Sequence, residues 1–361
     1  MNKNSAQLSM EELGRRERKL LKNSRHRRVM RALDRIFGFL LATGVLGTVA
    51  ILGLAYVFVK GPSPALSNAF TTTFLETRRF GWVSRIFLTD AETQGLIFSN
   101  NQGASEEAFF DPTLVTISTP APEADPNDEP AANPYGDVDE DGDGIILETV
   151  NGNGFVGYLI KILDPTRVFV SNGVGKTLGD QCIANGALGG INGGAFVDFN
   201  GTGDGSTPEG LTIVNDEVIN FGYGVNCFCG ITREGLLVVG WYSLEDVRSL
   251  GVVSGVTWGP ILIRNGVPTD LSSEHSLNPR TAIGQRADGC ILMLVIDGRQ
   301  VHSFGASYQD VQDVMLQNGA VNAFNLDGGS STTMWYNGGY VNSCSSANGI
   351  ARPVPDAFLF R

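Results

Sequence analysis

The pattern of apolar and polar positions divides the chain into three kinds of segment. Residues 36–59 form an apolar run without a single charge. Residues 60–118 carry apolar side chains at an intermittent helical spacing, which predicts a helical stalk. From residue 145 to residue 361, short apolar runs alternate with clusters of Gly, Asn, Asp and Pro. Such alternation predicts strands joined by turns.

The elements of this last region predict an α+β fold, a mixed β-sheet domain with a few packed helices. Residues 290–298 read CILMLVIDG, a continuous apolar run typical of a strand buried on both faces. A helix within SYQDVQDVMLQNGA (307–320) and a strand VNAFNLD (321–327) follow, which predicts a right-handed crossover and one parallel pair of strands. Asn-Gly pairs, as in PILIRNGVPTD, predict hairpins.

The uncharged run is long enough to cross a bilayer as a helix, since about 20 residues span the hydrocarbon core. It exceeds the core of a signal peptide, and no small-residue cleavage site follows it, which favours a membrane span over the alternatives of a cleaved signal or a buried helix. Residues 1–35 carry 11 Lys and Arg against 4 Asp and Glu. The positive-inside rule therefore predicts a basic cytoplasmic tail over 1–35, a single span over 36–59 and an extracellular remainder.

The remainder is acidic, because the whole chain has a formal net charge of −12 despite its basic start. This balance excludes nucleic acid as a partner, which would require a basic face. Five cysteines at irregular spacing, without a C-x-x-C pair, do not predict a zinc site. Residues 119–144 are rich in Pro, Ala, Asp and Glu and predict an extended acidic linker.

The end of this linker, DVDEDGDGIILE over residues 137–148, has the spacing of a calcium-binding loop from Asp137 to Glu148. Its context differs, because Gly144 stands where such loops carry an aliphatic residue and no helix flanks either side. We therefore expect a solvated linker and no cofactor, with calcium between Asp137 and Glu148 as the alternative.

Four polar, glycine-containing clusters stand at the ends of predicted strands, where sites are commonly built. They bring two carboxylates and two arginines onto neighbouring strands. Successive glycine N–H groups can form an anion-binding nest, and an arginine can grip a phosphate with two N–H groups. Asp327 would repel a phosphate, so it suits an acid, base or nucleophile at the neighbouring atom. The clusters are INGGAF (191–196), NPRTAIG (278–284), IDGRQ (296–300) and NLDGGSS (325–331).

The order of INGGAF, PEGLTI, WGPILIRNG, NPRTAIG, VIDGRQ, NAFNLDGGSSTTMW and RPVPDAF resembles the phosphodiester glycosidase family over residues 145–361. Lysosomal and bacterial exopolysaccharide-associated enzymes are among the members of this family. The chain departs from the family pattern twice. Two glycines follow Asp327 where many relatives have three, and Ala195 precedes Phe196 where Phe-Phe is common.

The resemblance implies hydrolysis of a bond between an anomeric carbon and a phosphodiester oxygen, through an oxocarbenium-like state. On this basis we expect Asp327 to be the principal carboxylate and Arg280 to be the cation that faces it. Asp297 would position Arg299 or assist water, or else form a structural turn. His275 and His302 would be surface residues or positioning partners. The expected substrate-binding residues are Asn192, Gly193, Gly194, Thr281, Arg299, Gly328, Gly329, Ser330 and Ser331.

The sequence thus predicts a membrane-anchored extracellular hydrolase that cleaves sugar-1-phosphodiester bonds in phosphorylated glycans of the cell envelope. Two alternatives stay open. The first is a non-catalytic module that binds phosphorylated polysaccharide during wall assembly. The second is a structural envelope protein that keeps the fold without its chemistry.

Overall fold

The computed structural model describes three parts of the chain. They are residues 30–60 without 31, 32, 34, 55, 58 and 59, residues 110–117, and residues 134–361 without 199–202, 273 and 347. The chain separates into two compact units, residues 1–61 and residues 62–361. Most of the predicted basic tail, the stalk from 61 to 109 and the linker from 118 to 133 lie outside the described residues.

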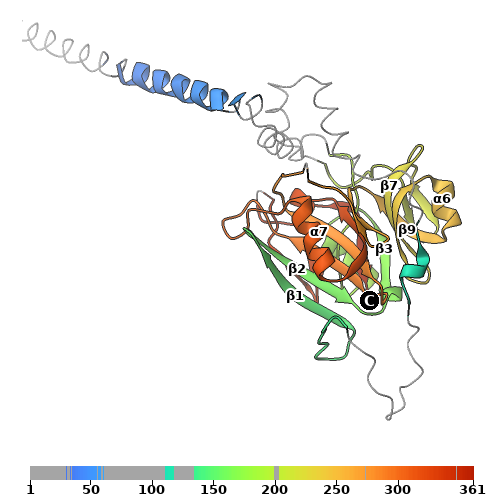
Figure 1. The fold of residues 1–361 in the computed structure, drawn as a ribbon. Helices are drawn as coiled ribbons and strands as arrows, with labels where there is room; N and C mark the ends of the chain where they lie inside the picture. The colour runs from blue at the N-terminus through green and yellow to red at the C-terminus, as the bar shows by residue number, and fades with distance from the viewer. Residues whose placement is uncertain are drawn as a thin grey trace, which may run out of the picture. The chain divides into compact units, whose positions relative to one another are not determined.

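The first unit contains an apolar helix, Arg35–Leu54, drawn in blue in Figure 1. Its 20 residues have a mean hydropathy of 2.2, and none of this segment is buried within the protein. Length and composition therefore fit a membrane span, as they would fit a signal sequence. The predicted span over 36–59 includes most of this helix.

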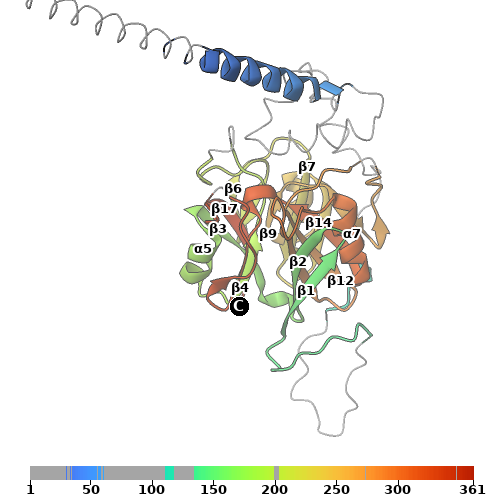
Figure 2. The ribbon, with the colours of Figure 1, turned by 90° about the vertical axis from the view of Figure 1, so that its left-hand side faces the viewer.

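Three antiparallel sheets make up the described residues of the second unit (Figures 1 and 2). The first has seven strands in the order β1 (Ile145–Gly152), β2 (Phe155–Ile162), β13 (Ile291–Ile296), β12 (Arg280–Arg286), β14 (Ala320–Leu326), β10 (Ile261–Arg264) and β11 (Val267–Pro268). The second has β16 (Gly339–Tyr340), β15 (Met334–Tyr336), β4 (Gly189–Asn192), β17 (Val354–Phe360) and β3 (Val168–Lys176). The third has β6 (Glu217–Asn220), β5 (Thr212–Val214), β9 (Val252–Thr257), β7 (Asn226–Thr232) and β8 (Leu237–Tyr242).

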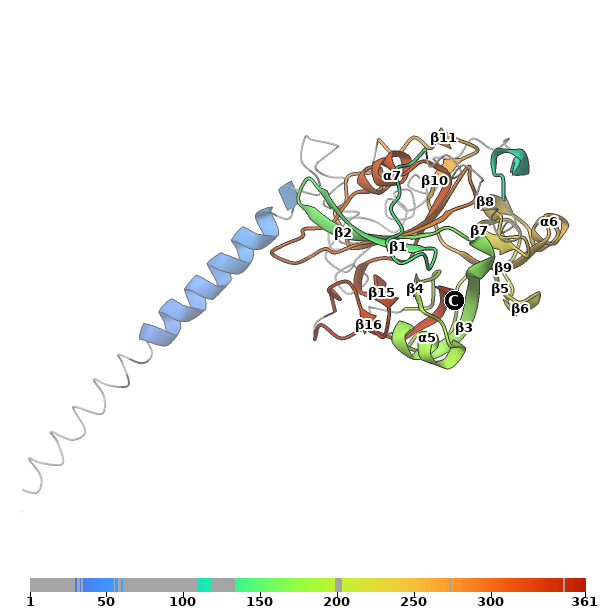
Figure 3. The ribbon, with the colours of Figure 1, turned by 90° about the horizontal axis from the view of Figure 1, so that it is seen from below.

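Helices cover the outer faces of these sheets. Figure 3 shows α7 (Tyr308–Gln317) over the seven-stranded sheet and α5 (Leu178–Asn185) over the second sheet. The third sheet carries α6 (Leu244–Ser249). Single 3-10 turns complete the described elements, namely η1 (Pro112–Leu114), η2 (Pro165–Arg167) and η4 (Gly329–Ser331).

The main hydrophobic core lies between the sheets, and β13 shows how one strand serves two cores. Its Met293 and Val295 side chains join the cluster shared by all three sheets. Its Leu292 and Leu294 side chains point the other way and pack with those of α7. Successive strand residues face opposite sides of a sheet. The predicted burial of this apolar run on both faces is therefore confirmed.

The Asn-Gly turn was predicted correctly from the sequence, and the structure adds a helix cap that was not predicted. Asn265 and Gly266 have φ values of 52° and 75° and join β10 to β11. This left-handed pair matches the right-handed twist of a tight hairpin. Ser307 and Asp310 form a capping box that begins α7. The Ser307 hydroxyl accepts from Asp310 N–H, and the Asp310 carboxylate accepts from Ser307 N–H.

The α+β fold is confirmed, but the predicted parallel pair is wrong. The crossover through α7 leads from β13 to β14, and β12 lies between them, antiparallel to both. β2 occupies the other edge of β13, so no edge is left for β14. The two strands run in the same direction without sharing a hydrogen bond, and every pairing among the described strands is antiparallel.

Parts of the predicted stalk and linker pack against this β-rich body. Phe110 is buried in the core of the third sheet, and Thr116 N–H donates to the Ala287 carbonyl at 2.8 Å. In the linker region, the Asp137 carboxylate accepts a hydrogen bond of 2.7 Å from Lys161 on β2. Burial and long-range pairing thus tie both described segments to the sheets.

Candidate functional site

The predicted polar clusters meet at one end of the central strands of the seven-stranded sheet. β12 begins where β13 and β14 end, because Arg280 pairs with Ile296 and Thr281 pairs with Leu326. Antiparallel pairing therefore places residues 278–280 beside the segments that follow β13 and β14. The end of β4 in the second sheet reaches the same end of these strands.

Residues 327–333, here called the Asp327 loop, follow β14 directly and contain η4. Both backbone groups of Asp327, its N–H and its carbonyl, bond to the end of β4. Asp327 N–H donates to the Gly193 carbonyl at 3.1 Å, and the Asp327 carbonyl accepts from Asn192 Nδ2 at 2.7 Å. Asp327 itself is half-buried. The principal predicted carboxylate thus sits where the two sheets join.

Asn192 and Thr281 hold this junction together from a fully buried position. Asn192 Oδ1 accepts from Thr281 Oγ1 at 2.8 Å and from Thr333 N–H at 3.1 Å. Together with the Nδ2 bond to the loop, both polar atoms of the Asn192 side chain are engaged inside the protein. The structure therefore places Asn192 and Thr281 as supports of the Asp327 loop, where direct contact with substrate hydroxyls was expected.

The expected nest of successive glycine N–H groups does not form in the Asp327 loop, because the N–H groups of Gly328 and Gly329 are used within the protein. Gly328 N–H donates to the Asp327 carboxylate at 3.0 Å. Gly329 N–H donates to the Pro279 carbonyl at 2.9 Å, and Ser331 N–H folds back onto Gly328 at 3.1 Å. The glycines thus allow a tight turn docked on the segment before β12. Anion binding at this loop would depend on side chains.

Arg280 does not face the Asp327 loop, which corrects the expected placement of the facing cation. Adjacent strand residues point to opposite faces, and Thr281 points to Asn192. The Arg280 guanidinium instead donates to the Ala306 carbonyl at 3.1 Å and to Ser276 at 2.9–3.0 Å. It also lies 3.8 Å from the ring centroid of Tyr308. Only 3% of this residue is exposed, so Arg280 braces the start of α7.

Arg299 is the arginine that lies against the Asp327 loop. A Cβ built on Gly329 would lie 3.3 Å from Arg299 Nη1 and 3.4 Å from Nη2, so the Arg299 guanidinium lies closely against Gly329. Asn278 Oδ1 accepts from Arg299 Nη2 at 2.7 Å and orients the guanidinium. Arg299 is exposed and has a φ of 59°, an uncommon conformation for a residue other than glycine. Its solvent-facing cation suits an anionic ligand.

A second arginine, Arg352, reaches the loop from the segment before β17. Its Nη1 lies 2.7 Å from Asp198 Oδ2 and 3.3 Å from Ser330 Oγ. The guanidinium carbon also lies 4.8 Å from the Phe196 ring centroid. The sequence contained this residue in RPVPDAF, but no site role was predicted for it. Arg352 thus contacts Ser330, a predicted substrate-binding residue, while Arg299 lies against the preceding Gly329.

Asp297 pairs with His302, and its hydrogen bonds within the described part of the chain go to groups other than Arg299. Asp297 Oδ2 lies 3.1 Å from His302 Nε2, and its Oδ1 accepts from Asn342 Nδ2 at 3.1 Å and from Ser343 N–H at 3.0 Å. The Asp297 side chain is fully buried, whereas that of His302 is 48% exposed. This pair orients one imidazole towards solvent, an arrangement suited to proton transfer.

The Asp297 pair is linked to the Asp327 loop through the segment after β16. Asn342 Nδ2 donates to the Thr332 carbonyl at 3.1 Å in addition to Asp297. Ser345 Oγ donates to the Gly329 carbonyl at 3.0 Å. The loops that carry Arg299, His302 and Asp327 are therefore neighbours.

A second buried carboxylate, Asp356 on β17, lies behind the Asp327 loop and was missed by the sequence reasoning. Its Oδ1 accepts from Gly194 N–H at 2.7 Å. A Cβ built on Gly193 would lie 2.2 Å from the same oxygen, so the glycine is required at that position. The signal was present, since Asp356 is the only charged residue in the otherwise apolar strand VPDAFLF. The predicted glycines 193 and 194 thus connect two aspartates.

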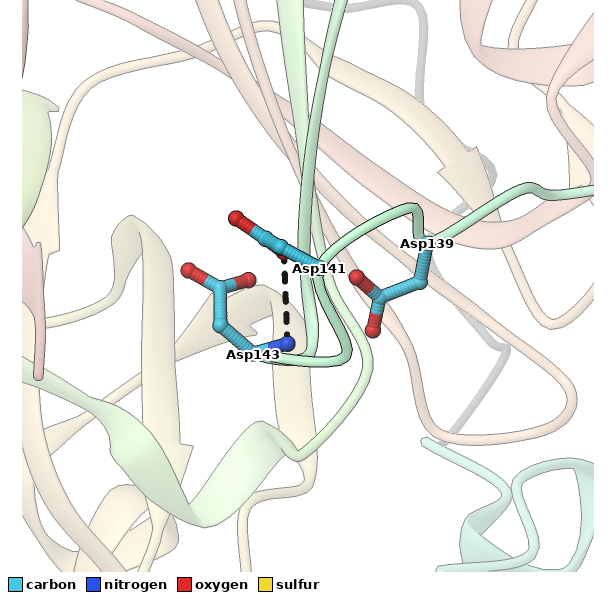
Figure 4. A group of neighbouring side chains, drawn as sticks. All are labelled: Asp139, Asp141 and Asp143. Atoms are coloured by element: carbon cyan, nitrogen blue, oxygen red, sulfur yellow. Dashed lines mark hydrogen bonds between the residues drawn. The ribbon is translucent and has the colours of Figure 1, made fainter.

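The acidic loop over 137–148 places its carboxylates differently from a calcium site with that spacing. Lys161 Nζ donates to Asp137 at 2.7 Å and to Glu148 at 2.8 Å, so an ammonium joins the first and last positions of the motif. Asp139, Asp141 and Asp143 remain grouped around the turn (Figure 4). Backbone N–H groups of the same turn already donate to all three. The geometry fits an acidic turn tied to β2, and calcium binding stays an untested alternative.

A family model described as phosphodiester glycosidase matches residues 185–361, which include every predicted site residue. This part of the chain belongs to the phosphodiester glycosidase family. The match begins at the last residue of α5, whereas β2 and β3 from the preceding residues complete two of the sheets.

Two relatives are similar to part of the chain. The mouse N-acetylglucosamine-1-phosphodiester alpha-N-acetylglucosaminidase is 30% identical over 222 residues, which cover 52% of this chain and 41% of that protein. The SPbeta prophage-derived uncharacterized protein YomE of Bacillus subtilis (strain 168) is 36% identical over 116 residues, covering 30% and 17%. The chain thus spans less than half the length of these relatives.

A solved structure supports the same fold. The zebrafish N-acetylglucosamine-1-phosphodiester alpha-N-acetylglucosaminidase catalytic domain, auto-inhibited by its pro-peptide, superposes with a TM-score of 0.51. The alignment covers 60% of this chain and 82% of that chain at 21% sequence identity. At this identity the likeness shows a shared fold.

Proposed function

We propose that this chain is a phosphodiester glycosidase that hydrolyses sugar-1-phosphodiester bonds in cell-envelope or exopolysaccharide glycans. One observation carries the proposal within the family. The Asp327 loop carries a half-buried carboxylate, and two arginines from distant segments lie against the next residues of the same loop, Arg299 at Gly329 and Arg352 at Ser330. One loop that combines a carboxylate with two cations suits a ligand in which a sugar carbon is joined to a phosphate.

The arginines would bind the phosphate and keep its position relative to Asp327. Arg299 is exposed and oriented by Asn278, so its fork can accept an incoming anion. Arg352 contacts Ser330, whose hydroxyl adds a donor. Asp327 would face the anomeric carbon and stabilise the positive charge that develops there.

The reaction breaks the bond between the anomeric carbon and the phosphate oxygen. The bonding electron pair leaves with that oxygen, which becomes part of a phosphate monoester. A water oxygen bonds to the anomeric carbon, and its proton passes to a base. His302, oriented by buried Asp297, is suited to take this proton. The phosphate leaves as an anion and needs little help from an acid.

The test is turnover of a chromogenic sugar-1-phosphodiester by the full chain in detergent. Wild type should release the sugar, and Asp327→Asn should lower kcat by about a thousandfold, the scale of losing a group that stabilises developing charge. The melting temperature should hardly change, because the loop's backbone bonds remain. Near-normal turnover in the folded variant would remove Asp327 from the chemistry.

Binding without turnover would support the alternative of a phosphoglycan-binding module. It is distinguished by equilibrium binding of the same phosphodiester to wild type and to Asp327→Asn. A binding module would hold the ligand equally well or better without the like charge, and would release no sugar in either form. Neither binding nor turnover would favour a structural envelope protein.

We also propose that residues 36–59 anchor the enzyme in the cell membrane with its C-terminal part outside. The apolar helix Arg35–Leu54 and the basic residues before it support this topology. Protease added to spheroplasts should then remove residues 61–361 and leave a small membrane-bound fragment. Release of the C-terminal part in soluble form without added protease, lacking the apolar helix, would identify the helix as a cleaved signal.

A further inference from the structure

Two aspartates are held on opposite sides of one glycine at the candidate site. Gly193 N–H donates to the backbone carbonyl of Asp356 at 3.1 Å, and the Gly193 carbonyl accepts from Asp327 N–H at 3.1 Å. The missing side chain of Gly193 lets the Asp356 carboxylate approach its Cα. The second sheet thus delivers Asp356 directly behind the loop that carries Asp327.

Among the described residues, no cation compensates the Asp356 carboxyl group. Its Oδ1 accepts from Gly194 N–H, whereas Oδ2 is buried and has no hydrogen-bond partner among the described residues. Only 1% of the residue is exposed. Burial is the largest cause that raises the pKa of Asp356 to about 7, the Gly194 bond lowers it, and the negative charge of Asp327 raises it further.

We propose that Asp356 is a positioning residue for the proposed reaction: it holds a proton behind Asp327, so that Asp327 alone carries the negative charge of the pair. A protonated carboxyl also satisfies the buried oxygen better than a charged one. Two adjacent carboxyl groups whose surroundings separate their proton affinities are a recurring device of acid–base sites. This inference rests on the proposed glycosidase function.

The surroundings of Asp356 leave Asp327 as the charged group that acts on it. From β3, Asn172 lies opposite, and from β4, Gly193 and Gly194 contact it. Val256 and Thr257 of β9 pack against Gly194. None of these side chains titrates. On its own segment, Arg352 is engaged by Asp198 at 2.7 Å.

The consequence is a rate that falls as Asp356 loses its proton. Below about pH 7 the pair carries one negative charge, and above it the second charge appears behind the loop. Wild-type kcat/KM should therefore fall by up to about tenfold per pH unit on the alkaline side. Asp356→Asn keeps the shape and the acceptor for Gly194 but is always neutral. It should keep activity near the wild-type maximum and lose that alkaline fall.

The matched control is Asp216→Asn, an exposed aspartate in the turn between β5 and β6 that pairs with Arg233 on the surface. Its pH profile should equal that of wild type. If Asp356→Asn lowers activity by the same factor at every pH, or keeps the wild-type profile, the inference is wrong. An inactive wild type would instead contradict the proposed function.

A second measurement tests the proton without turnover. Infrared difference spectra of wild type against Asp356→Asn should show the C=O stretch of a protonated carboxylic acid at pH 6 that disappears above neutral pH. In the Asp327→Asn background the same band should disappear at a lower pH, because the like charge is gone. Absence of the band at pH 6, or a midpoint unchanged by Asp327→Asn, would overturn the proposal even if the enzyme proves inactive.

Discussion

Asp356 and Asp137 are both nearly buried aspartates, yet their pKa values move in opposite directions. Burial raises the pKa of Asp356 to about 7, the Gly194 hydrogen bond opposes this shift, and the like charge of Asp327 adds to it. Burial also opposes the charge on Asp137, but hydrogen bonds from Lys161 and Arg286 outweigh it and lower the pKa. Behind the Asp327 loop, the Asp356 carboxyl group can therefore gain and lose a proton. In the acidic loop, the Asp137 carboxylate stays charged.

The difference shows that the ion-pair and hydrogen-bond partners of a polar cluster decide whether it stabilises the fold or forms a site. The acidic loop has the more regular spacing, yet its end positions are joined by Lys161 and serve the fold. The clusters around Asp327 are irregular in sequence, yet they leave an exposed arginine and an unpartnered carboxyl oxygen at one edge. Buried charges without partners are costly and are usually retained for function.

The largest expected effect is a pH-dependent change in stability, which should differ in sign between variants of the two aspartates. Wild type keeps the proton of Asp356 when folded, so this group's contribution to stability is complete below pH 3.8 and is lost as pH rises to about 7. The free energy of unfolding of wild type should therefore fall by roughly 4 kcal/mol more than that of Asp356→Asn as the pH rises from 4 to 8. Urea unfolding at both pH values measures this.

Asp137→Asn should show the opposite sign. Its lowered folded pKa stabilises the protein above the ordinary aspartate pKa, and that contribution is lost as pH falls through the folded value. The variant should be less stable than wild type at pH 7 and approach it in acid. The same pH trend in both variants would contradict the contrast between the two sites.

Lys161→Met tests whether the acidic loop is structural. The change removes the cation between Asp137 and Glu148, and loss of one member of a buried ion pair costs about 3 kcal/mol. The free energy of unfolding should fall by that amount, while kcat/KM at 25 °C stays unchanged. A loss of activity with unchanged stability would assign the loop a direct role in the reaction.

Arg299→Lys and Arg280→Lys make the same change at an exposed and at a buried arginine. Lysine keeps the charge but loses the planar fork. Arg299→Lys should lower kcat/KM about tenfold for a sugar-1-phosphodiester and little for the matched neutral aryl glycoside. Arg280→Lys should lower stability and affect both substrates equally. A phosphodiester-selective loss in Arg280→Lys instead would restore Arg280 as the phosphate-binding cation.

Chelation gives the smallest expected effect. Lys161 occupies the ends of the motif and backbone N–H groups cap Asp139 and Asp143, so EDTA should leave the melting temperature and activity unchanged. A drop in melting temperature that calcium restores would show that the three grouped aspartates bind the ion.

The sequence predicted local elements well and their assembly less well. Strand β13, the β10–β11 hairpin and helix α7 depend on periodicity, Asn-Gly turns and caps, which act over a few residues. The parallel pair failed because strand order depends on which edges remain open. Only the complete sheet shows that β12 separates β13 from β14.

The site divides in the same way. The sequence alone determined that Asp327, Arg299 and the glycines would lie at strand ends, because each polar cluster directly follows an apolar strand. Strand alternation then turned Arg280 to the other face, and the second sheet brought in Arg352 and Asp356. The tertiary structure decided which groups face Asp327 and which proton is held there, because charge and solvation depend on neighbours distant in sequence.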